Sequence, residues 1–289
     1  MIPFAKGHGL GNDYLVVARQ DLPHELSDAA IVRLCDRHWG IGADGILMLV
    51  PTTRAAFGLR IFNPDGSEAE KSGNGLRIFA KYLWDHGYAK SPAFTVDTKG
   101  GVVECHCVVK EGRVAVVVVE MGRATFRAAD IPLDGVHGEA VRVPLRLADG
   151  ATVTATAVNV GNPHCVVFVE RLDPAECRRM GPELERHPQF PQRTNVQFAR
   201  VSGKNALDIL IWERGAGYTL ASGSSSCGAA AAAVRIGRCD PGLVSVQMPG
   251  GVLAVDVRPD WSLRLEGPAE EVYRGTLTDE FIEAYLTPP

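Results

Sequence analysis

The sequence repeats itself at a constant offset. The segment IFNPDGSEAEKSGNG, which begins at Ile61, aligns without gaps with IWERGAGYTLASGSS, which begins 150 positions later at Ile211. The same offset pairs further residues: Asn12 with Asn162, Ser72 with Ser222, Gly87 with Gly237 and Gly100 with Gly250. Because one offset holds across several separate motifs, we infer a duplicated half-chain. The sequence therefore predicts two similar domains.

Each half shows the same expected order of elements. An apolar strand, YLVVA or HCVVFV, follows a Gly-Asn turn, and a second strand ends at Asn63 or Glu213. A polar loop and a Ser-Gly pair then lead into a helix and a Gly-Gly turn. In the first helix, expected over 73–85, the apolar residues recur at the spacing of a core-facing stripe. This pattern predicts an α+β fold, with domains over 1–122 and 123–276 and a helix over 277–289 that packs on the first half.

Composition indicates a globular protein with a small-molecule partner. Hydrophobic residues make up 46% and charged residues 22% of the chain, and the formal net charge is -4. A chain with this charge lacks the excess of basic residues that binding to nucleic acid or to an anionic membrane requires. The N-terminal stretch has no signal-peptide pattern, and no apolar run approaches the length of a membrane span. We expect a cytoplasmic protein.

The cysteines indicate buried thiols rather than a metal or redox site. There are seven, scattered along the chain, and none forms a Cys-x-x-Cys pair. Cys105 and Cys107 lie in VVECHCVVK, which alternates like a strand, so both side chains share one face. We expect free cysteines in the core, with no metal site and no cofactor.

Ser72 and Ser222 each stand directly before an expected helix. The free N–H groups and the positive dipole end of a helix N-terminus favour an anion. Related halves tend to place equivalent features on either side of a shared cleft, where ligand sites are common. One interpretation of the two serines is therefore that they mark a site for a carboxylate substrate. The alternative is that both serines act only as N-caps.

Five motifs carry a family resemblance. HGLGNDY, FNPDGSEAE-x-SGNGLR, GNPH, RTNVQF and WERGAGYTLASG extend from His8 over most of the chain. In their order and spacing they resemble diaminopimelate epimerase, a member of the cofactor-independent amino-acid racemase and epimerase superfamily. The resemblance implies two mirrored domains, each a sheet wrapped around a central helix, with the active site in the cleft between them. It also implies inversion at an α-carbon without pyridoxal phosphate or metal, by default between LL- and meso-diaminopimelate.

The resemblance also implies roles for individual residues. It assigns hydrogen bonds with an amino-acid substrate to Asn12, Asn63, Asn162 and Asn195, contacts with its charged groups to Glu213 and Arg214, and contacts with its reacting carboxylate to the amides of Gly73, Asn74, Gly223 and Ser224. Arg214 offers a bidentate fork for a carboxylate, and Glu213 an acceptor for an ammonium group. His164 is implied to lie near the reacting centre; alternatively, it only closes the turn before its strand.

The chain departs from the family pattern at the catalytic positions. The resemblance places a cysteine at each position occupied here by Ser72 and Ser222, where one thiolate removes the α-proton and the opposite thiol donates one. Serine does not titrate in the accessible range, so direct removal of a carbon-bound proton by serine is unfavourable. Tyr218 and Lys71 also differ from the pattern. Three hypotheses follow. The first is an epimerase or racemase in which Ser72, Ser222 and His164 transfer the protons. The second is a different carbanion-type isomerase or dehydratase, and the third is a non-catalytic relative that binds a ligand. The exposed surface expected for two sheet-rich domains favours a homodimer.

Overall fold

The structure is a computed structural model, and it describes residues 1–286. The chain forms two compact units. The first unit comprises residues 1–119 together with the chain from residue 267 onward, and the second comprises residues 120–266. The first boundary lies close to the expected residue 122. The second unit ends at 266 rather than 276, because β18 (Glu270–Leu277) returns to pair with β1 (Ile2–Gly9). Of the helix expected over 277–289, residues 287–289 lie outside the described part of the chain.

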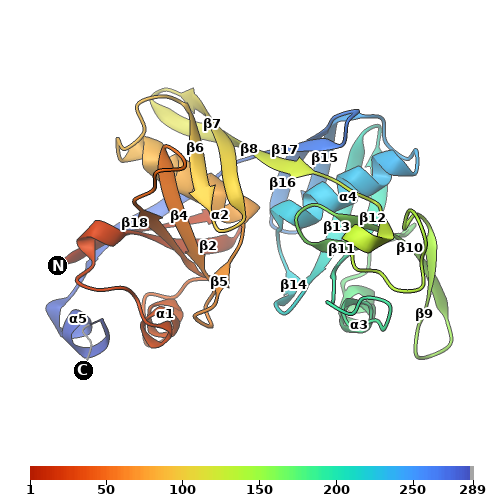
Figure 1. The fold of residues 1–289 in the computed structure, drawn as a ribbon, viewed down its shortest axis with the longest axis horizontal. Helices are drawn as coiled ribbons and strands as arrows, with labels where there is room; N and C mark the ends of the chain where they lie inside the picture. Colours follow the sequence, from red (N-terminus) through yellow and green to blue (C-terminus); the bar gives the residue numbers. More distant parts are fainter. Residues whose placement is uncertain (287–289) are drawn as a thin grey trace. The chain divides into compact units, whose positions relative to one another are not determined.

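One mixed sheet and helix α2 (Gly73–Asp85) form most of the first unit (Figure 1). The order of the strands is β18-β1-β2-β3-β4-β6-β7-β8, with the short β5 on β4. The pairs β2–β3 and β4–β6 are parallel and the others antiparallel. The bounds are β2 (Asn12–Ala18), β3 (Ile46–Val50), β4 (Phe57–Phe62), β5 (Glu68–Ala69), β6 (Ala93–Thr98), β7 (Gly101–Lys110) and β8 (Arg113–Arg123).

The second unit repeats this topology around helix α4 (Gly223–Arg235). Its strand order is β9-β10-β11-β12-β13-β15-β16-β17, with the short β14 on β13, and β11–β12 and β13–β15 are the parallel pairs. The bounds are β9 (Val143–Arg146), β10 (Thr152–Asn159), β11 (Pro163–Phe168), β12 (Asn195–Gly203), β13 (Ala206–Glu213), β14 (Gly217–Thr219), β15 (Gly242–Met248), β16 (Gly251–Val257) and β17 (Ser262–Gly267). Parallel and antiparallel pairs therefore alternate identically in the two sheets, which confirms the predicted pair of similar α+β halves.

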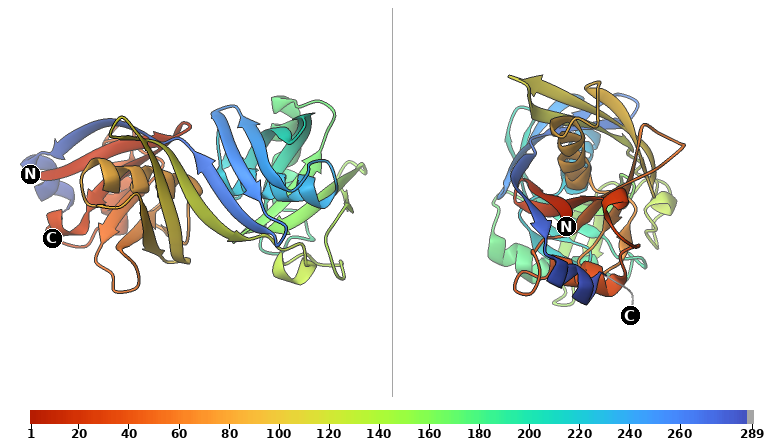
Figure 2. Two further views of the ribbon diagram at one scale, coloured as in Figure 1. Left: turned by 90° about the horizontal axis from the view of Figure 1, so that it is seen from above. Right: turned by 90° about the vertical axis from the view of Figure 1, so that its left-hand side faces the viewer.

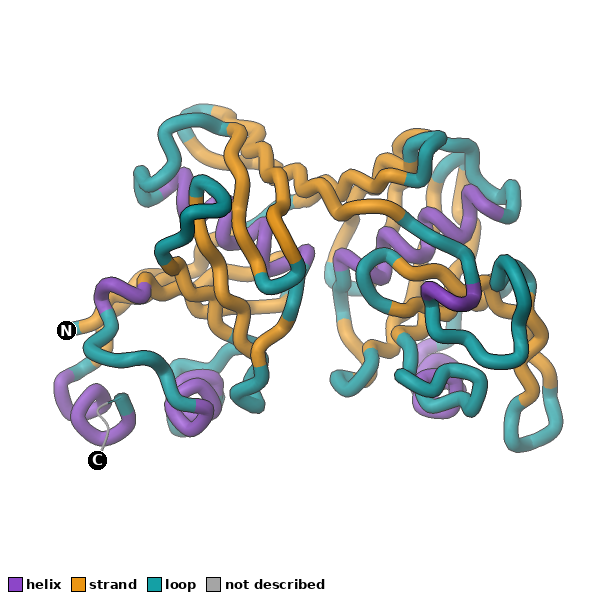
Figure 3. Tube along the Cα trace, in the orientation of Figure 1, coloured by secondary structure: helices purple, strands orange, loops and turns teal. Residues whose placement is uncertain are grey.

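Each unit has one long helix among its strands (Figures 1 and 3). Viewed from one end of the molecule, strands of the first unit lie around α2 (Figure 2, right). The predicted bounds of α2 are confirmed, and its apolar stripe of Leu76, Phe79, Ala80 and Leu83 is fully buried. In α4 the run Ala229–Ala233 is also fully buried, since alanine lets surrounding strands approach the helix on every side.

Shorter helices cover the outside of the sheets. They are α1 (Asp28–Cys35), α3 (Pro174–Glu185) and α5 (Asp279–Tyr285), with 3-10 turns at Arg19–Asp21 and Ala128–Asp130. Arg33 of α1 donates a hydrogen bond of 2.6 Å to the hydroxyl of Tyr285, and Leu286 joins the hydrophobic core that α1 covers. The C-terminal helix therefore packs within the first unit.

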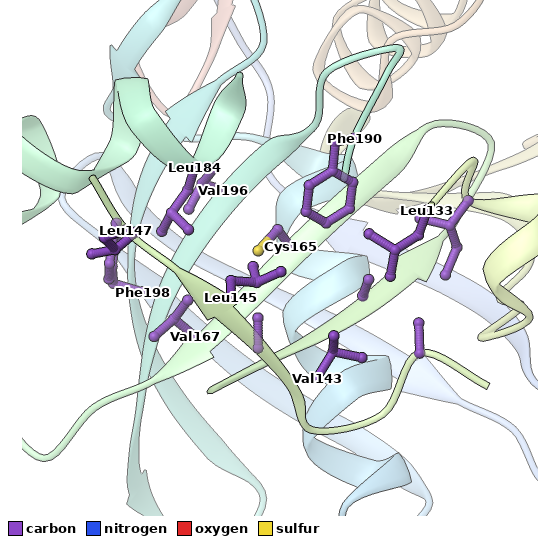
Figure 4. Close-up of a cluster of buried hydrophobic side chains, with 14 of the residues drawn as sticks. Leu133, Val143, Leu145, Leu147, Cys165, Val167, Leu184, Phe190, Val196 and Phe198 are labelled. Carbon is purple, nitrogen blue, oxygen red and sulfur yellow. The ribbon is translucent and has the colours of Figure 1, made fainter. Parts of the chain in front are cut away.

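The second unit has its own hydrophobic core beneath β9, β10 and α3. Leu145, Val167, Leu184 and Phe198 meet there with Cys165 (Figure 4). All seven cysteines are free and buried, as predicted, and burial raises the pKa of the Cys105 and Cys165 thiols to about 12. Within residues 1–286 there is no cluster of histidine, cysteine and acidic residues that could hold a metal ion, and no helix long and apolar enough to cross a membrane.

Candidate functional site

Ser72 is the N-cap of α2 in the first unit. Its Oγ accepts a hydrogen bond of 3.0 Å from the backbone N–H of Gly75, and its carbonyl accepts one from Leu76. The hydroxyl of Tyr14 lies 3.4 Å from the same Oγ. Ser72 therefore acts as an N-cap, and whether it also contacts a ligand stays a prediction. Tyr14 is a polar neighbour that the sequence did not single out. Capping leaves the N–H of Gly73 without a hydrogen-bond partner among the described residues.

A directed chain of hydrogen bonds runs through the amides beside Ser72. Arg77, fully buried, donates to Oδ1 of Asn74 at 2.8 Å, and Nδ2 of Asn74 donates to Oδ1 of Asn12 at 3.2 Å. Nδ2 of Asn12 then donates to Asp44 at 2.9 Å. Because a guanidinium only donates and a carboxylate only accepts, the two ends of this chain fix the orientation of both amides. Asn12 and Asn74 are thus held in one orientation.

Asp44 is anchored by a group of charged residues at the start of β2. Arg37 contacts Asp44 at 2.8 Å and Asp13 at 2.7 Å, and Lys6 contacts Asp13 at 2.9 Å. Burial raises the pKa of Asp13, but the hydrogen bonds from Arg37 and Lys6 outweigh it and hold that pKa below its usual range. Asp13 is therefore charged, and the group keeps Asp44 facing Asn12.

Ser222 is the N-cap of α4 in the second unit, as Ser72 is of α2. Its Oγ accepts from the backbone N–H of Ser225 at 3.4 Å, and its carbonyl accepts from the hydroxyl of Ser226 at 2.8 Å. Ser222 is 4% exposed, and its own N–H points to the sulfur of Met248. The backbone N–H groups of Gly223 and Ser224 have no partner in the part of the chain that the structure describes. These two groups are available to an anion.

His164 is completely buried between β11 and α4. Its Nε2 lies 2.8 Å from Oδ1 of Asn162, and its Nδ1 lies 3.0 Å from Nε2 of Gln197. A Cβ on Gly228 would lie 3.0 Å from the imidazole Cγ, so glycine allows α4 to pack on the ring. Burial, assisted by the positive charge of Arg214, lowers the pKa of His164 to about 3. The imidazole is therefore neutral, with both nitrogens engaged inside the second unit.

The remaining implied binding residues belong to turns at strand ends. Asn63 donates from Nδ2 to Oγ of Ser67 at 2.9 Å, which closes the turn after β4. Asn195 donates to the carbonyl of Pro163 at 3.0 Å and accepts from the backbone N–H of Arg214 at 3.0 Å. Arg214 is thereby fixed through its backbone, while its guanidinium donates to the carbonyl of Gln192 at 3.2 Å. Asn195 thus positions the Glu213–Arg214 pair, whose contacts with a ligand stay a prediction.

Some of the implied residues lie at the start of the central helix of each unit. In the first unit Asn12 is hydrogen-bonded to Asn74, which follows Ser72 and Gly73. In the second unit Gly223 and Ser224 begin α4 directly after Ser222, and Asn162 lies in the turn between β10 and β11, where it bonds to His164. Sequence reasoning missed Tyr14, Asp44, Arg77 and Gln197. Three of them lie inside the quoted motifs: Tyr14 in HGLGNDY, Arg77 in SGNGLR and Gln197 in RTNVQF. The repeat also aligns Tyr14 with His164.

The fold of this chain has counterparts among solved structures. A hydroxyproline epimerase from Agrobacterium vitis matches with a TM-score of 0.69 at 15% identity, over 96% of this chain and 90% of its own. A predicted epimerase from Pseudomonas aeruginosa matches with a TM-score of 0.67 at 19% identity, over 96% and 99%. At such low identities these likenesses show the fold alone.

Sequence comparison places the chain in a family. The model of the diaminopimelate epimerase family matches residues 4–127 and 156–272. A relative from Nostoc sp., named diaminopimelate epimerase 2, is 46% identical over 96% of each chain. The diaminopimelate epimerase of Pelotomaculum thermopropionicum is 42% identical over 94% of this chain and 97% of its own. The chain therefore belongs to the diaminopimelate epimerase family, a family of isomerases.

Proposed function

We propose that this protein is an amino-acid epimerase that inverts an α-carbon by proton exchange, and that LL-diaminopimelate is the first substrate to test. The observation that carries the proposal is the matched pair of capped helices, α2 and α4. Each starts at a serine that occupies the same position of the repeat. The N–H of Gly73 in α2 and those of Gly223 and Ser224 in α4 have no partner among residues 1–286 and can donate to an anion. Backbone N–H groups at a helix N-terminus suit the reacting carboxylate, whose negative charge grows as the α-proton leaves.

We further propose that serine stands at both positions where the family has proton-transferring cysteines. A hydroxyl transfers protons only when a neighbour assists it, because its own ionisation lies outside the accessible range. Tyr14, 3.4 Å from Ser72, is such a neighbour in the first unit. In the second unit, the residue that the repeat aligns with Tyr14 is His164, which bonds to Asn162 and Gln197. The reaction is therefore expected to be slow compared with a cysteine pair.

Solvent exchange tests the proposal directly. The protein is incubated with LL-diaminopimelate in heavy water, and deuterium at the α-carbon and the appearance of the meso isomer are followed by mass spectrometry and chiral separation. We expect both signals above a heat-denatured control. Absence of both, for this substrate and for a panel of other amino acids, would exclude an epimerase.

A one-base isomerisation of a related acid is the second candidate function. The unequal surroundings of the two serines favour it. Ser72 has a phenol beside its Oγ, whereas Ser222 is buried and has no phenol beside it among the described residues. This candidate predicts that Ser72→Ala and Ser222→Ala affect turnover unequally. Equal losses from the two variants would count against it and favour the two-base epimerase.

The cellular setting and the assembly are also proposals. The family membership supports a small amino-acid substrate and a cytoplasmic place of action. The homodimer expected from the exposed surface of the sheets awaits a measurement of mass in solution.

A further inference from the structure

The second unit contains a buried polar chain that the first unit lacks. It consists of Ser225, Gln197, His164 and Asn162, in that order. The first three are fully buried, and consecutive side chains are 3.0, 3.0 and 2.8 Å apart. At the equivalent positions of the first unit, the offset of 150 residues places Gly75, Leu47 and Tyr14.

The first unit shows that the fold does not need this polar chain. Leu47 packs against the start of α2 so closely that a Cβ on Gly75 would lie 2.9 Å from its Cδ2. An apolar residue thus fills the position of Gln197 in an otherwise similar arrangement. Burying a polar side chain is unfavourable unless hydrogen bonds compensate for its lost contacts with water. Oε1 of Gln197 has no hydrogen-bond partner within residues 1–286. The second unit therefore carries a cost that packing alone does not explain.

The donors and acceptors in the chain fix one proton arrangement. The Gln197 amide approaches both neighbours with Nε2, which only donates, so Nδ1 of His164 accepts and carries no proton. A neutral imidazole must then carry its proton on Nε2, which donates to Oδ1 of Asn162. The tautomer of His164 is therefore determined by Gln197.

The tautomer in turn determines what Asn162 offers to a ligand. Since Oδ1 accepts from His164, the Nδ2 group of Asn162 faces away from the ring, and it has no hydrogen-bond partner among the described residues. Asn162 is only half-buried, at the turn between β10 and β11. With the opposite tautomer, Nδ2 would turn inward and Oδ1 would face the ligand. One orientation suits a carboxylate, which only accepts, and the other suits an ammonium group.

We propose that Gln197 is a positioning residue: through the Nε2–H tautomer of His164, it turns the amide of Asn162 so that Nδ2 donates to a carboxylate of the amino-acid ligand. The identity of the ligand rests on the proposed function. The effect on the amide does not, because it follows from contacts inside the second unit. Gln197 thus contributes to ligand selection without touching the ligand.

The test combines a spectroscopic and a binding measurement on the full chain. Nitrogen-15 NMR of histidine-labelled protein reports which imidazole nitrogen carries the proton, and His164→Gln identifies the signal. We expect the wild type to show His164 with a proton on Nε2 alone. Gln197→Leu, which introduces the residue found at position 47, should lose that single tautomer. Gln197→Glu, which only accepts when ionised, should place a proton on Nδ1.

Binding of LL-diaminopimelate is then measured by calorimetry. We expect Gln197→Leu to weaken binding about tenfold, the effect of one misaligned hydrogen bond to a charged group. Gln189→Leu is the matched control, because Gln189 is a half-buried glutamine whose amide bonds to the carbonyl of Asp134 elsewhere in the second unit. This control should bind like the wild type.

The outcomes separate the inference from the proposed function. A proton on Nδ1 of His164 in the wild type would overturn the inference. It would also be overturned if Gln197→Leu lost the single tautomer but bound LL-diaminopimelate as tightly as the wild type. If no variant binds LL-diaminopimelate but the tautomer changes as expected, the positioning of Asn162 by Gln197 is supported and the proposed substrate is wrong. A circular dichroism spectrum like that of the wild type shows that each variant is folded.

Discussion

The hydroxyl of Tyr14 lies 3.4 Å from Oγ of Ser72, while the residue at the same position of the second unit, His164, bonds to Asn162 and Gln197. The duplicated halves therefore share a topology but differ in the side chain at this position and in its contacts. Any chemistry that needs a proton near Ser72 has a phenol available. In the second unit, Gln197 and His164 instead position the amide of Asn162.

Tyr14→Phe should slow α-proton exchange about threefold to tenfold, because it removes the hydrogen bond that assists Ser72. The rate is measured by deuterium incorporation from heavy water. Tyr273→Phe, on the exposed face of β18, serves as a control for the same chemical change. An unchanged rate in Tyr14→Phe would show that the phenol takes no part.

Replacing both serines by cysteine should raise the exchange rate about a hundredfold, provided the substrate is correct. A helix N-terminus lowers the pKa of a thiol towards neutrality, whereas a hydroxyl stays protonated. Each single variant, Ser72→Cys or Ser222→Cys, should gain less than the double variant, since inversion needs one group to remove a proton and another to deliver one. Ser245→Cys, exposed on β15, controls for the added thiol. No gain in the double variant would contradict the assignment of these positions.

His164 should make the protein less stable as the pH falls. Its pKa is lowered by burial to about 3 in the folded state, from about 6.5 when unfolded. Between these values the unfolded chain binds the extra proton, so the stabilisation present above pH 6.5 is lost towards pH 3. The slope is at most about 1.4 kcal/mol per pH unit. We expect urea unfolding at several pH values to show a shallower slope for His164→Gln, and an equal slope would indicate that His164 titrates normally.

Arg77→Met should lower the free energy of unfolding by about 3 kcal/mol, because it leaves buried acceptors without a donor. The guanidinium donates to the carbonyls of Gly73 and Pro268 and to Asn74, and it is fully buried. Urea denaturation measures the loss. Arg127→Met, at an exposed surface pair with Asp130, should leave the unfolding midpoint unchanged. A small loss in Arg77→Met would mean that the carbonyls find water instead.

The repeat made much of the fold predictable. An offset of 150 residues is a property of the chain, and it fixed the two halves, the start of α2 at Gly73 and the equivalent start of α4 at Gly223. The apolar stripe of α2 followed from helical periodicity. The return of β18 to β1 did not, because the pairing of Ile2 with Leu277 joins the two ends of the chain and leaves no local pattern.

The candidate site also has features that the sequence predicts and contacts that only the folded structure shows. Ser72 and Ser222 were recognisable because an N-cap is a local feature, set by a serine followed by a helix. The contacts that give their neighbours a role are not local: Gln197 contacts His164 from another strand, and Asp44 contacts Asn12 although 32 positions separate them in the chain. The sequence by itself determined a duplicated chain with a capped helix in each half. Only the tertiary structure decided which proton His164 carries and which way each asparagine faces, because the direction of a hydrogen bond depends on partners that folding brings together.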